Sequence, residues 1–262
     1  MNDNIIILCR HGERIDRTNH RNEQRANKDD PELTQRGNDL AKNIGKKIAT
    51  KFKSYIDKND IKLYSSPFTR TLETALSMRN EMQKIITNKD RQELLIVREL
   101  GEWNLYKINI YPTILYYLNG KKQKETKLYE DIILNKTNQS IKYDIKYIDN
   151  GEVKYPEKRE EADKRYINFL QKILNEIKGT TGNLVILVSH GEFVSACCRY
   201  LCSLIKKQIE KNIKSKDIKN LWPDFLNIIT GDNQKYCNSF CFKFDKNGNV
   251  SFYDTILPDE NI

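Results

Sequence analysis

Short, mainly apolar runs recur along the chain at residues 5–9, 61–64, 94–97 and 184–188. Runs of four or five residues are typical of strands, and uninterrupted apolar character indicates a strand that is covered on both faces. The first and last of these runs are wholly apolar. We therefore expect four strands buried inside a sheet.

Between these runs the apolar residues follow a helical spacing. Over residues 34–55 they recur every three or four positions, and Thr34 is a suitable N-cap. Ser66-Pro67 resembles an N-cap followed by a proline in the first turn, and residues 157–178 and 193–209 are two further predicted helices. Strands that alternate with helices predict a three-layer α/β/α sandwich with a mostly parallel central sheet.

Two regions depart from this alternation. Residues 106–156 are rich in Tyr, Lys and Asn and have weak periodicity. We interpret them as an inserted cap region within one domain that spans residues 1–262. Near the end of the chain, residues 239–244 and 250–253 flank a turn sequence at 245–249, which predicts a C-terminal hairpin of antiparallel edge strands.

Composition narrows the class of protein. The chain has 262 residues, of which 38% are hydrophobic and 31% charged, so a core can form beneath a solvated surface. No apolar run is long enough to span a bilayer, and no signal peptide is visible, so we expect no membrane span and a cytoplasmic location. The net charge of +9 favours anionic partners. Without a nucleic-acid-binding motif, a specific nucleic-acid partner is not expected, and a homodimer is left open.

The six cysteines include two pairs spaced four residues apart, Cys198 with Cys202 and Cys237 with Cys241. Such spacing is compatible with a zinc site, but only in a tetrahedral context. Buried thiols that act as small apolar residues are the simpler interpretation. We expect no metal and no cofactor.

Candidate chemistry gathers where the predicted strands end. Of three histidines, His11 and His190 are each followed by glycine, and each comes directly after an apolar strand, whereas His20 lies in a polar loop. Ligand sites of open α/β sheets lie at the carboxyl ends of strands. Arg70 follows the second strand in the first turn of a predicted helix, a position that favours anions. Residues 98–103 follow the third strand.

Five segments, in this order and at fitting intervals, resemble the histidine phosphatase (phosphoglycerate mutase-like) superfamily. They are Arg10-His11-Gly12-Glu13-Arg14, Leu33-Thr34-x-x-Gly37, Ser65-Ser66-Pro67-x-x-Arg70, Glu99 after a strand, and Ser189-His190-Gly191. Residues 10–16 and the aromatic, Cys-rich residues 236–241 are similar to one branch, which contains the suppressors of T-cell receptor signalling and the ecdysteroid-phosphate phosphatases.

The resemblance implies a metal-independent phosphomonoester hydrolase. His11 would attack phosphorus through one ring nitrogen, while the other donates to a backbone carbonyl. His190 would donate a hydrogen bond to the phosphate. Glu99 would protonate the leaving group and then activate water, with Glu102 as the alternative.

Arginine side chains are suited to neutralising the charge of a bound phosphate. A phosphomonoester dianion repels a nucleophile unless fixed cations neutralise its oxygens. Arg10, Arg14 and Arg70 are assigned to this role, because guanidinium groups give bidentate, permanently charged contacts.

The substrate is left open. A phosphorylated small molecule or a phosphoprotein would serve, and the branch resemblance implies phosphotyrosine or another aryl phosphate. Two alternatives are a phosphoglycerate-type mutase and a catalytically weak module that binds phosphorylated ligands. Cofactor-dependent mutases of the superfamily follow Arg-His-Gly with Glu-Ser and then Trp-Asn, whereas this chain has Glu13-Arg14-Ile15-Asp16. That difference counts against a mutase.

Overall fold

A computed structural model of the chain describes residues 3–17, 30–57, 61–85, 93–103, 145–148, 157–212 and 235–259. Its described strands form one seven-stranded sheet in the order β4-β3-β2-β5-β1-β6-β7. The four strands predicted from the apolar runs are all present. The strands are β1 (Asn4–Arg10), β2 (Ile61–Ser65), β3 (Glu93–Val97), β4 (Ile145–Ile148), β5 (Leu184–Ser189), β6 (Ser239–Phe244) and β7 (Val250–Ile256).

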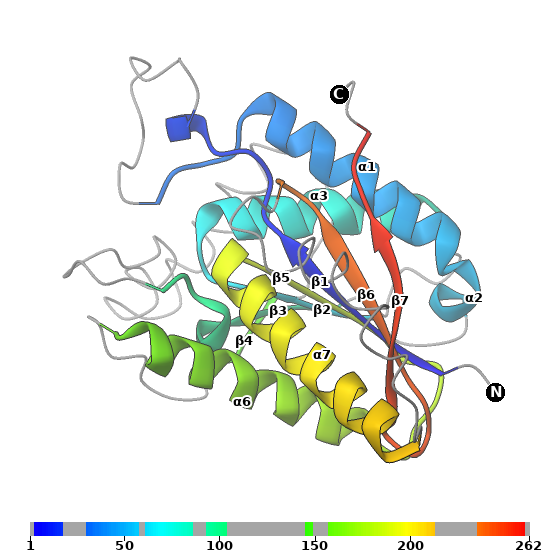
Figure 1. Ribbon diagram of the computed structural model, residues 1–262. Helices are drawn as coiled ribbons and strands as arrows, with labels where there is room; N and C mark the ends of the chain where they lie inside the picture. The colour runs from blue at the N-terminus through cyan, green and yellow to red at the C-terminus, as the bar shows by residue number, and fades with distance from the viewer. Residues whose placement is uncertain are drawn as a thin grey trace.

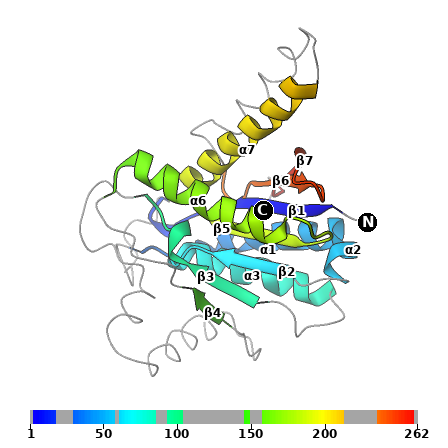
Figure 2. The same ribbon diagram turned by 90° about the horizontal axis from the view of Figure 1, so that it is seen from below.

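Helices cover both faces of the sheet (Figures 1 and 2). Helices α1 (Gln35–Lys51) and α3 (Thr69–Ile85) lie on one face, and α6 (Arg159–Ile177) and α7 (Gly191–Asn212) lie on the other. Alternate residues of β1 enter the two cores, Ile5 and Ile7 on the α1/α3 side and Ile6 and Leu8 on the α6/α7 side. The predicted three-layer α/β/α sandwich with a mostly parallel sheet is confirmed.

The register of the central strands brings their carboxyl ends together. β4, β3, β2, β5 and β1 run parallel, with Arg10 opposite Ser189 and Ser65 opposite both Val188 and Ile96. Side chains that directly follow β1, β2, β3 and β5 therefore meet at one edge of the sheet, as expected for a ligand site of this fold class.

The helix termini follow the sequence signals in part. Thr34 caps α1, since its hydroxyl accepts from the Gly37 N–H at 2.8 Å. The predicted helix is interrupted at Phe52, so a short helix α2 (Lys53–Ile56) completes it. The helix predicted over residues 157–178 is α6, and Gly179, with a φ of 77°, follows it.

The predicted cap of α3 at Ser66 was wrong. The helix begins at Thr69, three residues later. The hydroxyl of Ser66 is 2.9 Å from His190 Nε2. The carboxylate of Asp30, on a distant segment, accepts instead from the Thr69 N–H at 2.9 Å and from the Thr69 hydroxyl at 2.8 Å.

The C-terminal hairpin of β6 and β7 is confirmed. β6 pairs antiparallel with β1, and β7 forms the edge of the sheet. Gly248 in the turn has a φ of 83°, and the Asp245 carboxylate accepts from the backbone N–H groups of Asn247 and Asn249 at 2.8 Å each. These are the contacts that the turn sequence favours.

The predicted insertion at residues 106–156 lies outside the described residues, apart from β4. That strand pairs parallel with β3 and was not expected, because four residues inside a polar region carry little periodicity. His20 also lies outside the described residues. None of the described helices combines the length and apolar character that crossing a bilayer requires.

Candidate active site

His11 lies where β1 ends and is 2% exposed. Its Nδ1 is 2.7 Å from the carbonyl oxygen of Gly12. Because a carbonyl oxygen only accepts, Nδ1 carries the proton in the neutral ring, and Nε2 keeps its lone pair. This is the orientation that a nucleophilic histidine needs.

The backbone around His11 is held on two sides. The Gly12 N–H donates to the Thr74 hydroxyl at 3.0 Å, and the His11 carbonyl accepts from the Cys237 N–H at 3.3 Å. Gly12 also packs directly on Gly37, since a Cβ at Gly12 would lie 2.6 Å from the Gly37 carbonyl oxygen. The ring therefore projects from a peptide that cannot shift without breaking several contacts.

His190 follows β5 and is fully buried beside His11, with the two ring centroids 5.4 Å apart. Its Nδ1 is 3.4 Å from Arg70 Nη2, and its Nε2 is 2.9 Å from the Ser66 hydroxyl. A guanidinium group only donates, so Nδ1 accepts from Arg70 in this arrangement. The proton of the neutral ring is then on Nε2 and points to Ser66.

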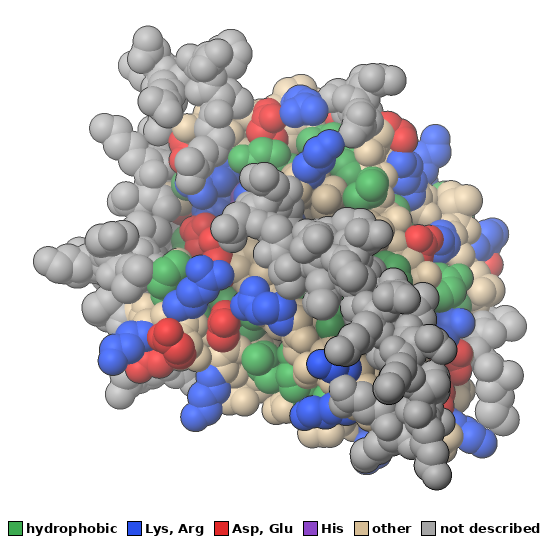
Figure 3. All heavy atoms as spheres, in the orientation of Figure 1, with side chains coloured by type: hydrophobic (Ala, Val, Ile, Leu, Met, Phe, Trp, Pro, Cys, Tyr) green, Lys and Arg blue, Asp and Glu red, His purple; other side chains and the backbone are tan. Residues whose placement is uncertain are grey.

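Both rings are held in the neutral form. Burial lowers the pKa of His11 well below 6.5, and the charge of Arg70 lowers it further. Burial and the Arg70 charge likewise lower the pKa of His190 well below 6.5. Neither histidine is visible on the molecular face in Figure 3, where Lys and Arg side chains alternate with Asp and Glu.

Arg70 is the most enclosed cation of the site, at 1% exposure. Its Nη1 is 3.4 Å from Asp30 Oδ1, its Nη2 is 2.5 Å from Glu102 Oε2, and its guanidinium carbon lies 4.5 Å from the Phe68 ring centroid. Burial lowers the pKa of Arg70, and the carboxylates of Glu102 and Asp30 oppose that shift. The site therefore contains a permanent positive charge beside His190 that is almost completely shielded from water.

Arg14 reaches the same place from the segment after β1. Its Nε and Nη2 donate to the two carboxylate oxygens of Asp16 at 2.9 and 2.7 Å, and its Nη1 is 3.8 Å from Glu102 Oε1. Asp16 raises the pKa of Arg14 against the effect of its burial. A bidentate pair of this kind fixes the direction of the guanidinium plane.

Arg10 occupies the other side of His11. Its guanidinium carbon lies 4.7 Å from the Tyr236 ring centroid, and that ring is also 5.8 Å from the His11 ring. Burial lowers the pKa of Arg10, while Tyr236 and the carboxylates of Glu192 and Glu102 oppose the shift. Burial also raises the pKa of Glu192, and the neighbouring Glu102 charge raises it further.

The two candidate proton donors occupy different environments. The Glu102 carboxylate, whose side chain is 29% exposed, contacts Arg70 at 2.5 Å and lies 3.9 Å from His190 Nδ1. Glu99 lies in the short 3₁₀ helix η3 (Arg98–Leu100) and is partly buried, and its carbonyl accepts from Arg165 at 2.6 Å. These carboxylate contacts place Glu102 in the arginine and histidine cluster. The role of Glu99 stays a prediction.

Several residues of the site were missed in the sequence. Asp30 lies in a polar segment without hydrophobic periodicity, and only the tertiary fold brings it into contact with Arg70. Thr74 had a usable signal, since it lies one helical turn after Arg70 and shares its helix face. Ser66 was interpreted as a helix N-cap. Tyr236 was noted only as part of residues 236–241, which are similar to one branch of the superfamily.

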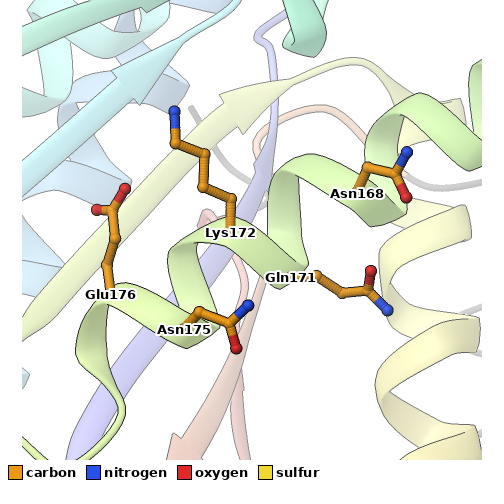
Figure 4. Close-up of a pocket in the computed structure, with 5 residues that line it drawn as sticks. All are labelled: Asn168, Gln171, Lys172, Asn175 and Glu176. Atoms are coloured by element: carbon orange, nitrogen blue, oxygen red, sulfur yellow. The ribbon is translucent and has the colours of Figure 1, made fainter.

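Two other features of the described residues, a surface hollow and the cysteines, carry no phosphate chemistry. A surface hollow of about 580 Å³ lies along the outer face of α6 (Figure 4) and is lined by Asn168, Gln171, Lys172, Asn175 and Glu176. It has one cation and no nucleophile. The six cysteines are free and buried, and within the described ranges no three His, Cys, Asp or Glu side chains are grouped to hold a metal. Buried thiols are thus confirmed.

Both the sequence and the fold resemble a known superfamily. Residues 6–109 match the sequence model of the histidine phosphatase superfamily, branch 1. That segment contains Arg10, His11, Arg14, Arg70 and Glu99. The resemblance of this chain to the histidine phosphatase superfamily is therefore confirmed.

Solved structures extend the likeness to nearly the whole chain. The ecdysone phosphate phosphatase of Bombix mori, in complex with tungstate, has a TM-score of 0.60 and 17% identity, covering 98% of this chain and 94% of that one. A phosphoglycerate mutase from Bacillus anthracis has a TM-score of 0.51 and 18% identity, covering 97% and 93%. A mycobacterial glucosyl-3-phosphoglycerate phosphatase has a TM-score of 0.50 and 13% identity, covering 96% and 98%.

These structural matches concern the fold, since all three identities are low. No curated protein sequence matches the chain significantly. The fold is thus shared with phosphatases and with a mutase, and the chemistry has to be argued from the residues of this chain.

Proposed function

We propose that this chain hydrolyses phosphomonoesters without a metal ion, through a phosphohistidine on Nε2 of His11. The observation that carries the proposal is the hydrogen bond from His11 Nδ1 to the Gly12 carbonyl, which leaves Nε2 unprotonated in a buried ring. Three arginines lie around this ring, so a phosphate dianion can approach the lone pair.

The reaction proceeds in two displacements. In the first, the Nε2 lone pair forms a bond to phosphorus while the bond from phosphorus to the ester oxygen breaks, and that oxygen takes a proton from a carboxylic acid. In the second, water attacks the phosphohistidine, the carboxylate accepts its proton, and the phosphorus–nitrogen bond breaks. The products are an alcohol or phenol and inorganic phosphate.

We propose Glu102 as the proton donor, in preference to Glu99. Its carboxylate contacts Arg70 Nη2 at 2.5 Å, a donor that a phosphate oxygen can also use. A bound dianion would replace the carboxylate on Arg70, so that the Glu102 carboxyl group can act on the leaving oxygen.

Ser66 allows the ring proton of His190 to be on either Nε2 or Nδ1. When phosphate replaces the carboxylate at Arg70, the Ser66 hydroxyl can turn and donate to His190 Nε2, because a hydroxyl both donates and accepts. His190 Nδ1 then carries the proton and donates to the phosphate. The 2.9 Å contact between Ser66 and His190 supports this exchange.

Aryl phosphates, including phosphotyrosine, are the substrate class that we propose to test first. The Tyr236 ring lies 5.8 Å from the His11 ring and flanks the nucleophile with an aromatic face. An aromatic leaving group can pack against such a face.

The deciding experiment is hydrolysis of para-nitrophenyl phosphate in excess EDTA by the wild type and by His11→Ala. We expect turnover that survives EDTA and falls at least about 1000-fold in the variant, since a removed nucleophile leaves only binding and charge stabilisation. Rapid acid-free quenching with labelled substrate should trap phosphate on the wild-type protein alone. Circular dichroism of both proteins controls for folding.

Each other outcome has a distinct meaning. Activity that persists in a folded His11→Ala protein would show that the nucleophile is wrongly assigned. A folded wild type that hydrolyses no aryl or alkyl phosphate would contradict the proposal. A bisphosphoglycerate-dependent mutase assay and a phosphate-binding measurement would then separate the two alternatives.

A further inference from the structure

Residues 98–103, which we call the acid loop, carry both Glu99 and Glu102 and are held by one backbone donor and by side-chain donors of other elements. Four successive carbonyls of this loop accept hydrogen bonds. The Arg98 carbonyl accepts from the Gly101 N–H at 2.8 Å, and the Leu100 carbonyl accepts from Ser189 Oγ at 2.6 Å. The Glu99 carbonyl accepts from Arg165 Nη1 at 2.6 Å. The Gly101 carbonyl accepts from Tyr166 Oη at 2.9 Å and from Arg165 Nη1 at 3.2 Å.

Arg165, on α6, donates two of these five hydrogen bonds. Its Nε and Nη2 donate to the two carboxylate oxygens of Glu157 at 2.8 and 2.6 Å, while its Nη1 serves the acid loop. The two side chains are only 11% and 7% exposed. A planar guanidinium that is fixed on one edge by a carboxylate presents its remaining donor in one direction.

Glu157 is tied to the acid loop a second time. Its carbonyl accepts from Trp103 Nε1 at 2.8 Å, so the last described residue of the loop is bonded to the residue that the carboxylate–guanidinium pair holds. The guanidinium of Arg159 lies 5.7 Å from the Trp103 ring centroid. Arg165, Glu157 and Trp103 therefore close a ring of contacts around the acid loop.

Arg165 and His11 are held by different sets of residues. Arg165 contacts Glu157, Tyr166 and the carbonyls of Glu99 and Gly101. His11 is held by Gly12, Thr74 and Cys237, and its backbone N–H donates to the Ser189 carbonyl at 2.9 Å. Ser189 also contacts the acid loop, but it is fixed in β5. A change at Arg165 should thus move the loop that carries the acid and leave the attacking nitrogen where it is.

We propose that Arg165 is a positioning residue for the proton donor, acting through the carbonyls of Glu99 and Gly101. The inference rests on the proposed function, but it holds whichever glutamate donates the proton, because both lie on the acid loop. Its consequence is a rate loss that depends on the leaving group. An ester whose leaving oxygen is a strong base needs the proton, whereas one with a weakly basic oxygen departs without it.

The test measures kcat/KM on a series of aryl and alkyl phosphates ordered by leaving-group basicity. The variants are Arg165→Met and Arg165→Lys. Lysine keeps the positive charge beside Glu157, so we expect it to preserve the fold if methionine does not. Its ammonium group lacks the planar fork of a guanidinium, so it cannot bond both Glu157 and the carbonyls of the acid loop. Arg199→Met is the matched control, because it removes a different ion pair of α6, that of Arg199 with Asp163 at 3.2 Å, away from the acid loop.

We expect both Arg165 variants to lose about 10- to 100-fold on phenyl and alkyl phosphates and little on dinitrophenyl phosphate. The limb of the pH–rate profile that reports the acid should weaken in parallel, and Arg199→Met should match the wild type throughout. An equal loss on every ester, or no loss in a folded variant, would overturn the proposal. A wild type that turns over no ester would instead remove the proposed function, and this inference with it.

Discussion

The nucleophile side and the acid side of the site are built in different ways. His11 and His190 directly follow the neighbouring central strands β1 and β5 and are 2% and 0% exposed. Glu102 lies on a loop outside any strand, and its side chain is 29% exposed. The proposed nucleophile is thus fixed by the sheet, whereas the proposed proton donor depends on side chains that reach it from other elements.

In the reaction that we propose, the two sides also have different tasks. The nucleophile needs one ring orientation and a neutral ring, which burial and a carbonyl acceptor provide permanently. The donor must release and recover a proton, so it needs access to water and room to leave Arg70. Greater exposure of Glu102 is consistent with that cycle.

The largest effect that separates the two sides is expected from the acid. Glu102→Gln should lower kcat/KM on phenyl phosphate by about 100- to 10,000-fold, because glutamine keeps the shape but has no proton to transfer. On dinitrophenyl phosphate the loss should be small. Steady-state kinetics on both esters measure this, and Glu99→Gln is the matched variant. If Glu99→Gln shows the leaving-group-dependent loss and Glu102→Gln does not, our choice of donor is wrong.

The two His-Gly pairs provide a second contrast. A Cβ at Gly12 would lie 2.6 Å from the Gly37 carbonyl oxygen, whereas a Cβ at Gly191 would lie 3.6 Å from Arg10 Nε, an ordinary contact. Gly12→Ala should cost about 1–3 kcal/mol of stability, and a displaced His11 should lower kcat about 100-fold. Gly191→Ala should be close to the wild type in both. Chemical denaturation and kinetics test this, and equal behaviour of the two variants would contradict the packing argument.

The smallest expected effect is on the pH dependence of stability. The unfolded chain protonates each histidine below about pH 6.5, but the folded protein keeps His11 and His190 neutral because their pKa values lie well below 6.5. The unfolded state therefore binds more protons, and the free energy of unfolding falls with pH below 6.5 by about 1.4 kcal/mol per unit for each ring. The contribution of the two neutral rings to the free energy of unfolding is fully present above pH 6.5.

Denaturation of the wild type and His11→Ala from pH 8 to pH 5 measures this slope. His11→Ala should show a shallower decline, because one of the two buried rings is gone. Glu192 acts in the opposite direction, since burial raises its pKa, but it is present in both proteins and cancels in the difference. Equal slopes would mean that His11 is protonated in the folded protein or is not buried.

Sequence signals served well where a contact is local or a period is strong. The apolar runs identified β1, β2, β3 and β5, and the Asp245–Asn249 turn identified the hairpin. They failed at β4, which is four residues long and gains its place by pairing with β3. They also failed at Ser66, whose hydroxyl has a partner 124 residues away that local capping rules do not include.

The sequence by itself determined the layered α/β architecture and placed His11, His190 and Arg70 at strand ends, because strand period and chain order bring such residues to one edge of a sheet. Only the tertiary structure decided that Asp30 underlies Arg70, that Glu102 contacts Arg70 and His190, and that Arg165 holds the acid loop. The physical reason is that these contacts join residues far apart in the chain: 40 positions for Asp30 and Arg70, 32 for Arg70 and Glu102, and 66 for Glu99 and Arg165. Their geometry depends on how helices pack on the sheet, which no local pattern encodes.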